Sequence, residues 1–554
     1  MNSYERFKII SEDYADIIVE YNRDYSIFEA YEEYVYNLIN EKYAVLHIPV
    51  NRIDEHSIKR YGYYAMPKCY GLTTYRWQEP TNQYKVRSFP EYELTGKGVL
   101  VGFIDTGIDY TNKTFIKSDN TTKIKYIWDQ SIDSENYPEG IFYGTEYSSE
   151  EINRALNSDN PYDIVPSKDE IGQGTAMASI SAGYQIAEQG FSGVSTDASL
   201  IVVKLKPAKT YLRDFYGIPD EAVCYQVNDI MMGIEYLINQ AKKLQSPIAI
   251  CIGVASSQGS HKGEDIFSNY LVENGNRTGV AIVVAGGNEG DQKHHYYGEI
   301  SPPKIYDIAE LHVGKQDKYF TMELWGQLPN LLTVEIYSPR GVLLHELQPE
   351  FSGQKNMTLQ YENTTIHVDS YISETYSEEQ LIMFRFRNIK EGVWRFRISG
   401  TRDLISSFHI WLPITNFIST ETYFLRPNQY TTLSIPGNAM NTIAIASYDP
   451  VNRIIAYSSG RGFTSINLPK PDVTAPGVNI LAPALNNSFE PLSGTSLAAA
   501  YATGVTVGLL EWGIVRGYFP SMNSMIARYF LTNSATRSPD RSYPNPEWGF
   551  GLIE

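Results

Sequence analysis

Three polar side chains occur where enzymes that attack carbonyl groups place their reactive residues. Asp105 ends the apolar run "VLVGFID", Asn288 follows two glycines in "VVAGGNEG", and Ser496 precedes an Ala-rich stretch in "LSGTSLAAAYATGV". A hydroxyl at a helix N-terminus can act as a nucleophile, and an Asn amide can stabilise an oxyanion. Taken singly, each residue has a structural alternative, as a turn carboxylate, a turn amide or a helix N-cap. In combination they favour acyl-transfer chemistry.

An open, mostly parallel α/β sheet is predicted to position these residues. From about residue 98, the runs "GVLVGFID", "SLIVVKLK", "PIAICIG" and "GVAIVVAGG" are typical of parallel strands buried on both faces. Helix-like segments such as "TAMASISAGY" and "QVNDIMMGIEYLINQAKKL" lie between them. Because such sheets carry their active groups at the carboxyl ends of strands, the position of Asp105 fits a functional role.

Changes in hydrophobic period divide the chain into five segments. Residues 1–66 predict a small α+β unit, with a helix around "YEEYVYNLINEKY" and a strand at "YAVLHIPV". Residues 67–97 are rich in turn residues and predict a linker. Residues 98–300 and 426–554 carry the α/β pattern. Residues 301–425 alternate with period two, which predicts a β-sandwich insert with few helices.

Composition restricts the possible partners and location. The 46 basic and 64 acidic residues give a net charge of −18, which argues against nucleic acid or an anionic membrane as a partner. Three scattered cysteines, Cys69, Cys224 and Cys251, predict neither a disulfide framework nor a metal cluster. We identify no cofactor site and no calcium loop. The N-terminus lacks a signal-peptide pattern, and we identify no apolar run of membrane-spanning length, so we expect an intracellular protein.

The motifs together resemble the subtilisin-like serine proteases (subtilases, peptidase family S8). The stretches "DTGID", "GQGT", "AGGNEG", "DVTAPGVNI" and "GTSLAAAYATG" match that family in order, over roughly 98–298 and 426–554. The extra segments, with "AVLHIP", "SSQGSH" and "YPNPEWGFG", are similar to the Csp germination proteases of clostridial spores. This resemblance implies a subtilisin-like fold, an N-terminal prodomain, a jelly-roll insert and a location in the spore. Active Csp members are endopeptidases that process a cortex-lytic hydrolase.

By motif position, the catalytic histidine of the family falls on Gln173. The resemblance assigns Asp105 and Ser496 to the other catalytic positions and Asn288 to the oxyanion hole. Serine attack needs a base that accepts the hydroxyl proton and later returns it to the leaving amine. A carboxamide can do neither, although Asp105 could still accept a hydrogen bond from it. We expect none of the nine histidines to replace the missing base.

Binding of a peptide is expected to survive without turnover. The resemblance places these residues along the substrate-binding strand and beside the oxyanion site: Cys251, Ile252, Gly253, Gly286 and Gly287. An extended peptide can add to such a strand through main-chain hydrogen bonds. Because self-cleavage should fail, the prodomain should stay attached, and the segment after it should remain in or near the cleft as a built-in inhibitor.

Three functional hypotheses follow. The first is a Csp-like pseudoprotease that binds its own prodomain in cis and regulates a sibling Csp protease or a cortex-lytic pro-enzyme, or relays a small-molecule germinant signal. The second is a weakly or conditionally active endopeptidase, favoured by the retained Asp105, Asn288 and Ser496. The third is a binding module that uses the β-sandwich, whose Trp325, Trp394 and Trp411 could contact carbohydrate or protein, although buried core aromatics explain them equally well.

Overall fold

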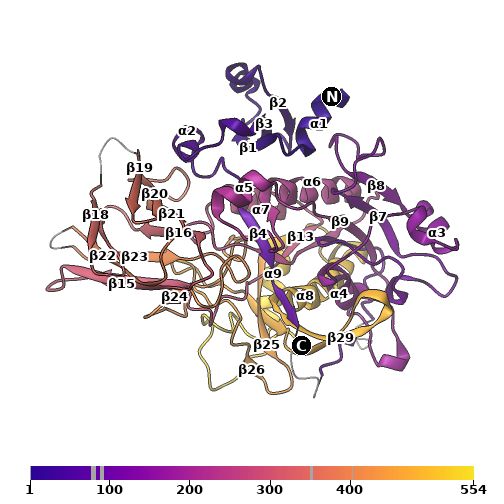
Figure 1. The fold of residues 1–554 in the computed structure, drawn as a ribbon. Coiled ribbons are helices and arrows are strands. Elements are labelled where there is room, and N and C mark those ends of the chain that lie inside the picture. Colours follow the sequence, from indigo (N-terminus) through magenta and orange to yellow (C-terminus); the bar gives the residue numbers. More distant parts are fainter. Residues whose placement is uncertain (1, 77–82, 88–92, 350–353, 402–403) are drawn as a thin grey trace.

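A nine-stranded sheet forms the centre of the molecule. The computed structural model describes residues 2–76, 83–87, 93–349, 354–401 and 404–554 (Figure 1). The strand order is β26-β25-β13-β11-β6-β9-β7-β8, with β27 paired to β25. Six strands lie parallel to a neighbour along this path, and the short edge strands β8 and β26 are antiparallel. The strands are β6 (Leu100–Asp105), β7 (Ile124–Asp129), β8 (Thr145–Ser148), β9 (Ser199–Lys204), β11 (Ile248–Ile252), β13 (Val280–Ala285), β25 (Ile443–Asp449), β26 (Ile454–Ile455) and β27 (Val473–Pro476).

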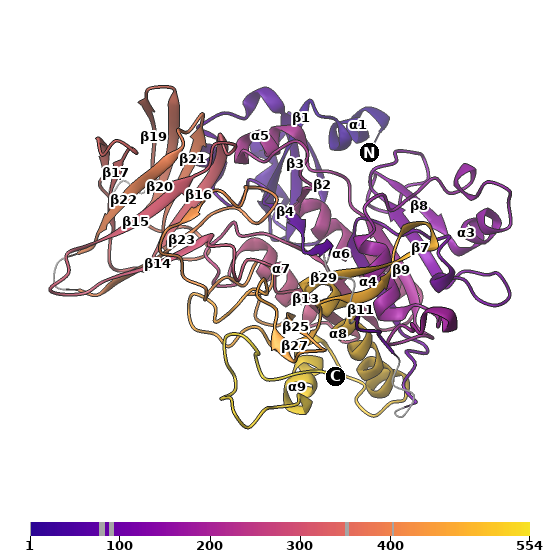
Figure 2. The ribbon, with the colours of Figure 1, turned by 60° about the horizontal axis from the view of Figure 1, so that its bottom comes forward.

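Helices cover both faces of this sheet. Every residue of β6, β11 and β13 is buried, which explains their uninterrupted apolar sequences. One face packs against α6 and α7, and the other packs against α4, α8 and α9 (Figures 1 and 2). The helices are α3 (Ser149–Leu156), α4 (Gln173–Ala182), α5 (Thr210–Tyr216), α6 (Val227–Lys243), α7 (Ile266–Gly275), α8 (Thr495–Leu510) and α9 (Ser524–Ser534). The predicted α/β architecture is therefore confirmed.

One helix corrects the expectation that no apolar segment is long enough to span a membrane. Together α8 and the π-helical turn after it, Glu511–Val515, form a 21-residue helix, and the most apolar 18-residue window in it has a mean hydropathy of 1.3. Its most apolar window is 72% buried inside the protein, against β11, β13 and β25. The apolar composition is accounted for by this central packing position.

The N-terminal unit is a small α+β domain that packs beside α5 and α6 (Figure 1). We call it the prodomain, after the role that the sequence resemblance predicts for it. Its antiparallel sheet has the order β1-β3-β2. The elements are α1 (Ser3–Ile10), β1 (Tyr14–Glu20), β2 (Val35–Leu38), β3 (Tyr43–Pro49) and α2 (Ser57–Tyr61). The strand predicted at "YAVLHIPV" is confirmed as β3. The helix predicted around residues 31–43 is wrong, because Val35–Leu38 pairs with β3 as a strand.

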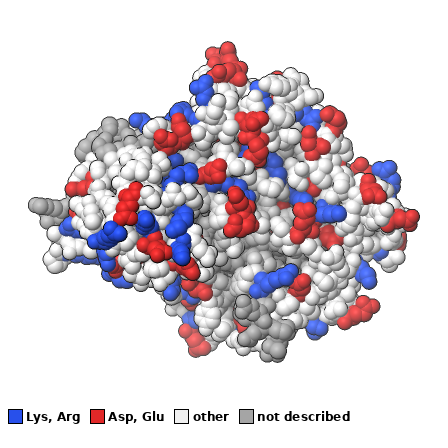
Figure 3. Space-filling view, in the orientation of Figure 1, with Lys and Arg blue, Asp and Glu red and all other residues white. Residues whose placement is uncertain are grey.

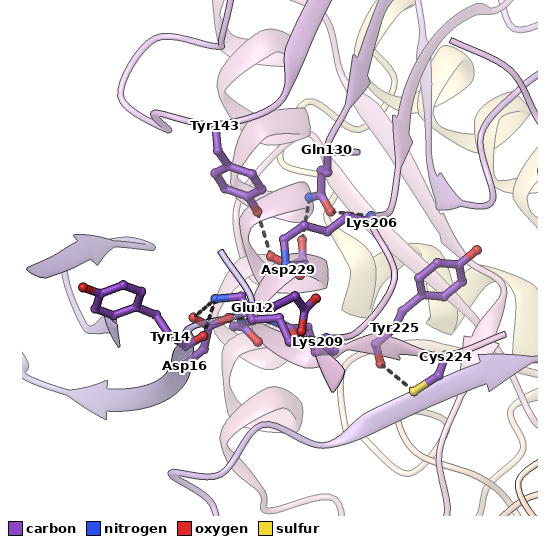
Figure 4. A network of polar contacts seen from close by, with 12 residues as sticks. Glu12, Tyr14, Asp16, Gln130, Tyr143, Lys206, Lys209, Cys224, Tyr225 and Asp229 are labelled. Carbon is purple, nitrogen blue, oxygen red and sulfur yellow. Dashed lines mark hydrogen bonds and ion pairs between the residues drawn. The ribbon is translucent and has the colours of Figure 1, made fainter. Parts of the chain in front are cut away.

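A buried ionic network joins the prodomain to the α/β unit (Figure 4). The carboxylate of Asp16 lies 2.8 Å from Lys209 Nζ and accepts a hydrogen bond of 2.6 Å from Gln226 Nε2. Within the prodomain, His47 Nδ1 lies 2.8 Å from the same carboxylate. Burial opposes ionisation of Asp16, but the ammonium of Lys209 and the His47 hydrogen bond hold its pKa well below the usual range. The prodomain thus contributes a buried anion that only the α/β unit neutralises fully.

The insert is built from two antiparallel sheets around one hydrophobic core. Their orders are β14-β23-β16-β21-β20-β19 and β18-β17-β22-β15-β24. Trp325, Trp394 and Trp411 are at most 3% exposed, so none presents a ring to solvent as a carbohydrate platform. The strands are β14 (His295–Ile300), β15 (Tyr306–Val313), β16 (Tyr319–Gly326), β17 (Thr333–Tyr337), β18 (Leu343–Leu347), β19 (Gln354–Tyr361), β20 (Thr364–Tyr371), β21 (Gln380–Arg387), β22 (Gly392–Ser399), β23 (Ser406–Trp411) and β24 (Tyr423–Phe424).

A buried glutamate links the insert, the prodomain and the α/β unit. Both carboxylate oxygens of Glu323, on β16, lie 2.7 Å from the Tyr63 hydroxyl of the N-terminal segment. The Gly259 amide of the α/β unit donates to the same carboxylate at 2.9 Å. Figures 1 and 2 both show the insert beside the α/β unit with the prodomain against the two. The insert therefore holds the prodomain in place as well as extending the fold.

Charges of both signs are interspersed on the face shown in Figure 3. On the insert, several arginines are paired with carboxylates on neighbouring strands. Arg397 lies 2.9 Å from Glu335, and Arg395 lies 3.0 Å from Glu310. These pairs reduce the positive potential that the arginines would otherwise present.

Candidate active site

The chain's own segment 69–76 runs through the groove at the carboxyl edge of the sheet. Cys69–Leu72 forms β4, which lies antiparallel between β12 (Val254–Ala255) and β10 (Tyr225–Gln226). In Figure 1 the violet segment that carries β4 descends from the prodomain across the body of the molecule. A strand paired on both sides is bound as an extended substrate peptide would be.

The same segment continues as a second strand on the far side of Thr73. Thr74–Arg76 forms β5, which pairs antiparallel with β29 (Phe489–Gly494), itself paired with β28 (Ile480–Pro483). The backbone of Gly494 has φ +143°, and a Cβ there would lie 2.0 Å from the Thr73 carbonyl oxygen. Gly494 therefore lets the bound segment approach the start of α8.

The Thr73–Thr74 peptide bond lies at the predicted nucleophile. Asn288 Nδ2 donates to the Thr73 carbonyl oxygen at 2.7 Å, and Ser496 Oγ donates to the same oxygen at 3.0 Å. Ser496 Oγ also hydrogen bonds to the side-chain hydroxyl of Thr74. Asn288 is fixed in turn, because its Oδ1 accepts hydrogen bonds from the amide and hydroxyl of Thr495, both at 3.1 Å. The structure thus brings two of the predicted residues, Asn288 and Ser496, to one carbonyl group.

The other two predicted residues contact each other. Asp105 ends β6 and Gln173 begins α4, directly after Gly172 in the left-handed conformation (φ +99°). Gln173 Nε2 lies 3.0 and 2.9 Å from the two oxygens of Asp105, and 3.0 Å from the Gly253 carbonyl oxygen. Burial raises the pKa of Asp105 to about 7, although the hydrogen bonds from Thr106 and Gln173 favour its charged form.

A titrating base is missing from the hydrogen bonds of the nucleophile. In the described part of the chain, the hydroxyl of Ser496 bonds only to Thr73 and Thr74, and no imidazole reaches it. Gln173 Oε1 is buried with no hydrogen-bond partner among the described residues. Because an amide has no usable pKa, the arrangement can bind and polarise the Thr73 carbonyl but cannot take up the serine proton.

The strand that pairs with the bound segment lies about two residues further along the chain than the sequence predicted. Cys251 and Ile252 are buried inside β11 and pair with β6 and β13, whereas the bound segment pairs with Val254 and Ala255. Gly253 takes part through its carbonyl oxygen, which accepts a 2.8 Å hydrogen bond from the Thr73 hydroxyl.

The two glycines before Asn288 lie at a close approach. Gly286 and Gly287 follow β13, and Gly287 adopts φ +84°, where a Cβ would lie 2.0 Å from Ser434 Oγ. They shape the turn that presents Asn288 to the bound carbonyl.

Sequence reasoning missed the pairing strands β10, β12 and β29. Their short runs show no distinctive periodicity, and each pairs with a segment far away in the sequence. The glycine of "SGTS" was the one local sign that a backbone approaches this point.

Comparison with known proteins agrees with this fold. The model of the subtilase family matches residues 96–343 and 420–551. The chain belongs to the subtilase family of serine proteases. The structure of the Clostridium perfringens CspB protease superposes with a TM-score of 0.74 at 30% identity, covering 84% of this chain and 96% of that one. The chain is therefore Csp-like within its family.

More distant relatives share the family but not the length. C5a peptidases of Streptococcus pyogenes serotypes M6 and M1 are 23% identical over 505 residues, which is 85% of this chain. The chain spans about two-fifths of the length of these curated relatives, at 39% and 40%.

Proposed function

We propose that this protein is a Csp-like pseudoprotease that acts by binding in spore germination. It would regulate a sibling Csp protease or a cortex-lytic pro-enzyme, or relay a small-molecule signal, from within the spore. The observation that carries the proposal is the amide of Gln173, which engages both oxygens of Asp105 at 2.9–3.0 Å in the position the family gives to the catalytic histidine.

The missing base removes the proton transfers on which turnover depends. In subtilisin, loss of the catalytic histidine lowers kcat by about 2 × 10⁶, even with the serine and the oxyanion hole intact. Here the Gln173 amide donates to Asp105, so the carboxylate orients a group that cannot accept a proton. Ser496 and Asn288 alone support binding of a carbonyl group, not useful turnover.

The occupied cleft supports a binding role over a proteolytic one. A substrate would have to displace β4 from two strands and β5 from a third. The displacement is further opposed by the buried pair of Asp16 and Lys209, which holds the prodomain on the α/β unit. The protein thus presents its outer surfaces to partners, while its substrate groove is filled by its own chain.

The alternative, a weak or conditional endopeptidase, is favoured by one observation. Asn288 and Ser496 lie 2.7 and 3.0 Å from the same carbonyl oxygen, a geometry suited to oxyanion stabilisation. Under this alternative the Thr73–Thr74 bond would be cut slowly by Ser496.

The intact mass of the purified protein separates the two functions. The wild-type chain and the Ser496→Ala variant are produced in a host without related proteases, and both are expected to remain single chains, 62.7 kDa for the wild type. A wild-type chain split after Thr73, beside an intact Ser496→Ala chain, would overturn the pseudoprotease proposal.

A further inference from the structure

A cavity of about 400 Å³ adjoins the occupied cleft. One wall is the bound segment itself, from Leu72 to Tyr75, and another is the turn that carries Asn288. The lining also includes the insert loop at residues 414–416 and the segment from Ile454 to Ser458. The cavity therefore lies where the insert, the α/β unit and the chain's own bound segment, residues 69–76 (the tether), meet.

The occupied cleft determines what kind of molecule this cavity can accept. Main-chain pairing by β10, β12 and β29 is already taken up by the tether, so these strands offer an incoming peptide no free partner groups. The Thr73 side chain is directed away into a hydrogen bond with the Gly253 carbonyl. A compact molecule that needs no strand pairing can still enter, and the volume lies in the range of small-molecule sites.

The lining combines apolar walls with acidic groups. Ala255, Ile414, Ile455, Ala456 and Val478 supply apolar surface. The carboxylates of Glu289, Asp291 and Asp449 also line the cavity, and the described lining residues include no lysine or arginine.

Two of these carboxylates and one hydroxyl indicate the kind of polar group that a ligand would carry. Glu289 is buried and accepts hydrogen bonds from Thr415 and His294. Asp291 is exposed, and among the described residues its side chain bonds to the neighbouring Gln292 side chain. Ser434 Oγ is buried in the lining and has no hydrogen-bond partner among the described residues. A ligand group that both donates and carries positive charge would satisfy this set.

We propose that this cavity binds a small organic cation with an apolar body. This inference rests on the proposed function, because it names the chemical class of a signal that a binding protein of this kind would receive. The ammonium group lies toward Asp291, and the apolar body packs on the walls next to the tether. Since Thr73, Thr74 and Tyr75 line the cavity, the bound molecule contacts the tether directly.

Three probes that share an indole ring test the charge preference. Tryptamine is cationic, tryptophol is neutral and indole-3-propionate is anionic, and their dissociation constants are measured by calorimetry on the Ser496→Ala full-length chain. We expect tryptamine to bind more tightly than tryptophol, and tryptophol more tightly than the anion. Equal binding of the three probes, or no binding at millimolar concentration, would overturn the proposal.

Variants of Asp291 and Tyr457 locate the binding site. Asp291→Asn should raise the dissociation constant of tryptamine about fivefold and leave that of tryptophol unchanged, as expected for a unit charge acting through water at close range. Tyr457→Ala should weaken the binding of both tryptamine and tryptophol, because this ring, which is 71% exposed, lines the cavity. Asp119→Asn and Tyr518→Ala change exposed residues that do not line the cavity, and they should bind as the parent does. If the Asp291 and Tyr457 variants behave like these controls, the probes bind elsewhere and the proposal is wrong.

Failure of this inference can be told apart from failure of the proposed function. If the chain remains intact in the mass experiment but no probe binds, only the ligand assignment is lost. If the wild-type chain cuts itself, the pseudoprotease proposal fails, while the probe series on Ser496→Ala still reports on the cavity.

Discussion

The side-chain amide of Asn288 donates a 2.7 Å hydrogen bond to the carbonyl oxygen of Thr73, a residue of the same chain. Ser496 lies at the same oxygen, 3.0 Å away. A peptide bond of the protein's own N-terminal segment is therefore held against the predicted nucleophile, with its flanking residues paired as strands. Under the proposed function, the residue beside Asp105, Gln173, is what distinguishes this arrangement from a competent serine protease.

An imidazole at position 173 should allow Ser496 to cut the peptide bond that it contacts. We expect Gln173→His to cut the chain between Thr73 and Thr74, because that carbonyl already contacts Ser496 and Asn288. Mass spectrometry and N-terminal sequencing should find fragments 1–73 and 74–554. The double variant with Ser496→Ala should stay intact, and cleavage at a different bond would show that the bound segment is not the substrate.

Removing the oxyanion donor should slow this restored cleavage. In the Gln173→His background, Asn288→Ala is expected to lower the rate of chain cleavage by about 10²–10³, as the loss of one oxyanion donor does in subtilisin. The rate is followed by gel densitometry after synthesis of the chain. An unchanged rate would mean that the amide contact with Thr73 does not persist as the bond is attacked.

The buried ion pair at the prodomain should contribute strongly to stability. Lys209→Met leaves Asp16 buried without its ammonium partner, and we expect a loss of about 3–5 kcal/mol in the free energy of unfolding. Urea denaturation provides the measurement. Lys243→Met removes the same charge from an exposed pair with Glu139 and should cost less than about 1 kcal/mol. If the two variants lost similar amounts of free energy of unfolding, burial would not be the reason that the pair of Asp16 and Lys209 stabilises the protein.

Acid should destabilise the junction between the insert and the α/β unit. His409 is buried, its Nδ1 lies 2.9 Å from His295 Nε2, and its ring stacks on Trp411. Burial lowers the pKa of His409 to about 3, so between pH 6.5 and that value the unfolded chain binds a proton that the folded chain does not. Its contribution to stability is complete above the unfolded pKa and declines as pH falls, by up to about 1.4 kcal/mol per pH unit.

The His409→Phe variant tests this pH dependence. Phenylalanine retains the aromatic stack but does not titrate, so the free energy of unfolding should change less steeply with pH between about 3 and 6.5 than in the parent. Comparing slopes removes the effect of the lost hydrogen bond at neutral pH. Parallel curves for the two proteins would exclude a contribution from His409.

Several elements could be predicted from the sequence because their signals are local. The continuous apolar runs at β6, β9, β11 and β13 mark strands buried on both faces, and the structure has strands there. The contact of Gln173 with Asp105 was expected from the family resemblance, which places both residues at catalytic positions, and the structure has it. The helix predicted around residues 31–43 failed because the pairing of Val35–Leu38 with β3 overrides local helical periodicity.

The motifs in the sequence are sufficient to predict the subtilase architecture, the candidate residues Asp105, Asn288 and Ser496, and the carboxamide at position 173. Which peptide bond lies at Ser496 is visible only in the folded chain. Residues 69–76 have turn-rich, polar sequence that predicts a loop, yet they form β4 and β5 because β10, β12 and β29 satisfy their main-chain groups. Such pairing depends on distant backbone rather than on local side-chain pattern, so it appears only when the chain is folded.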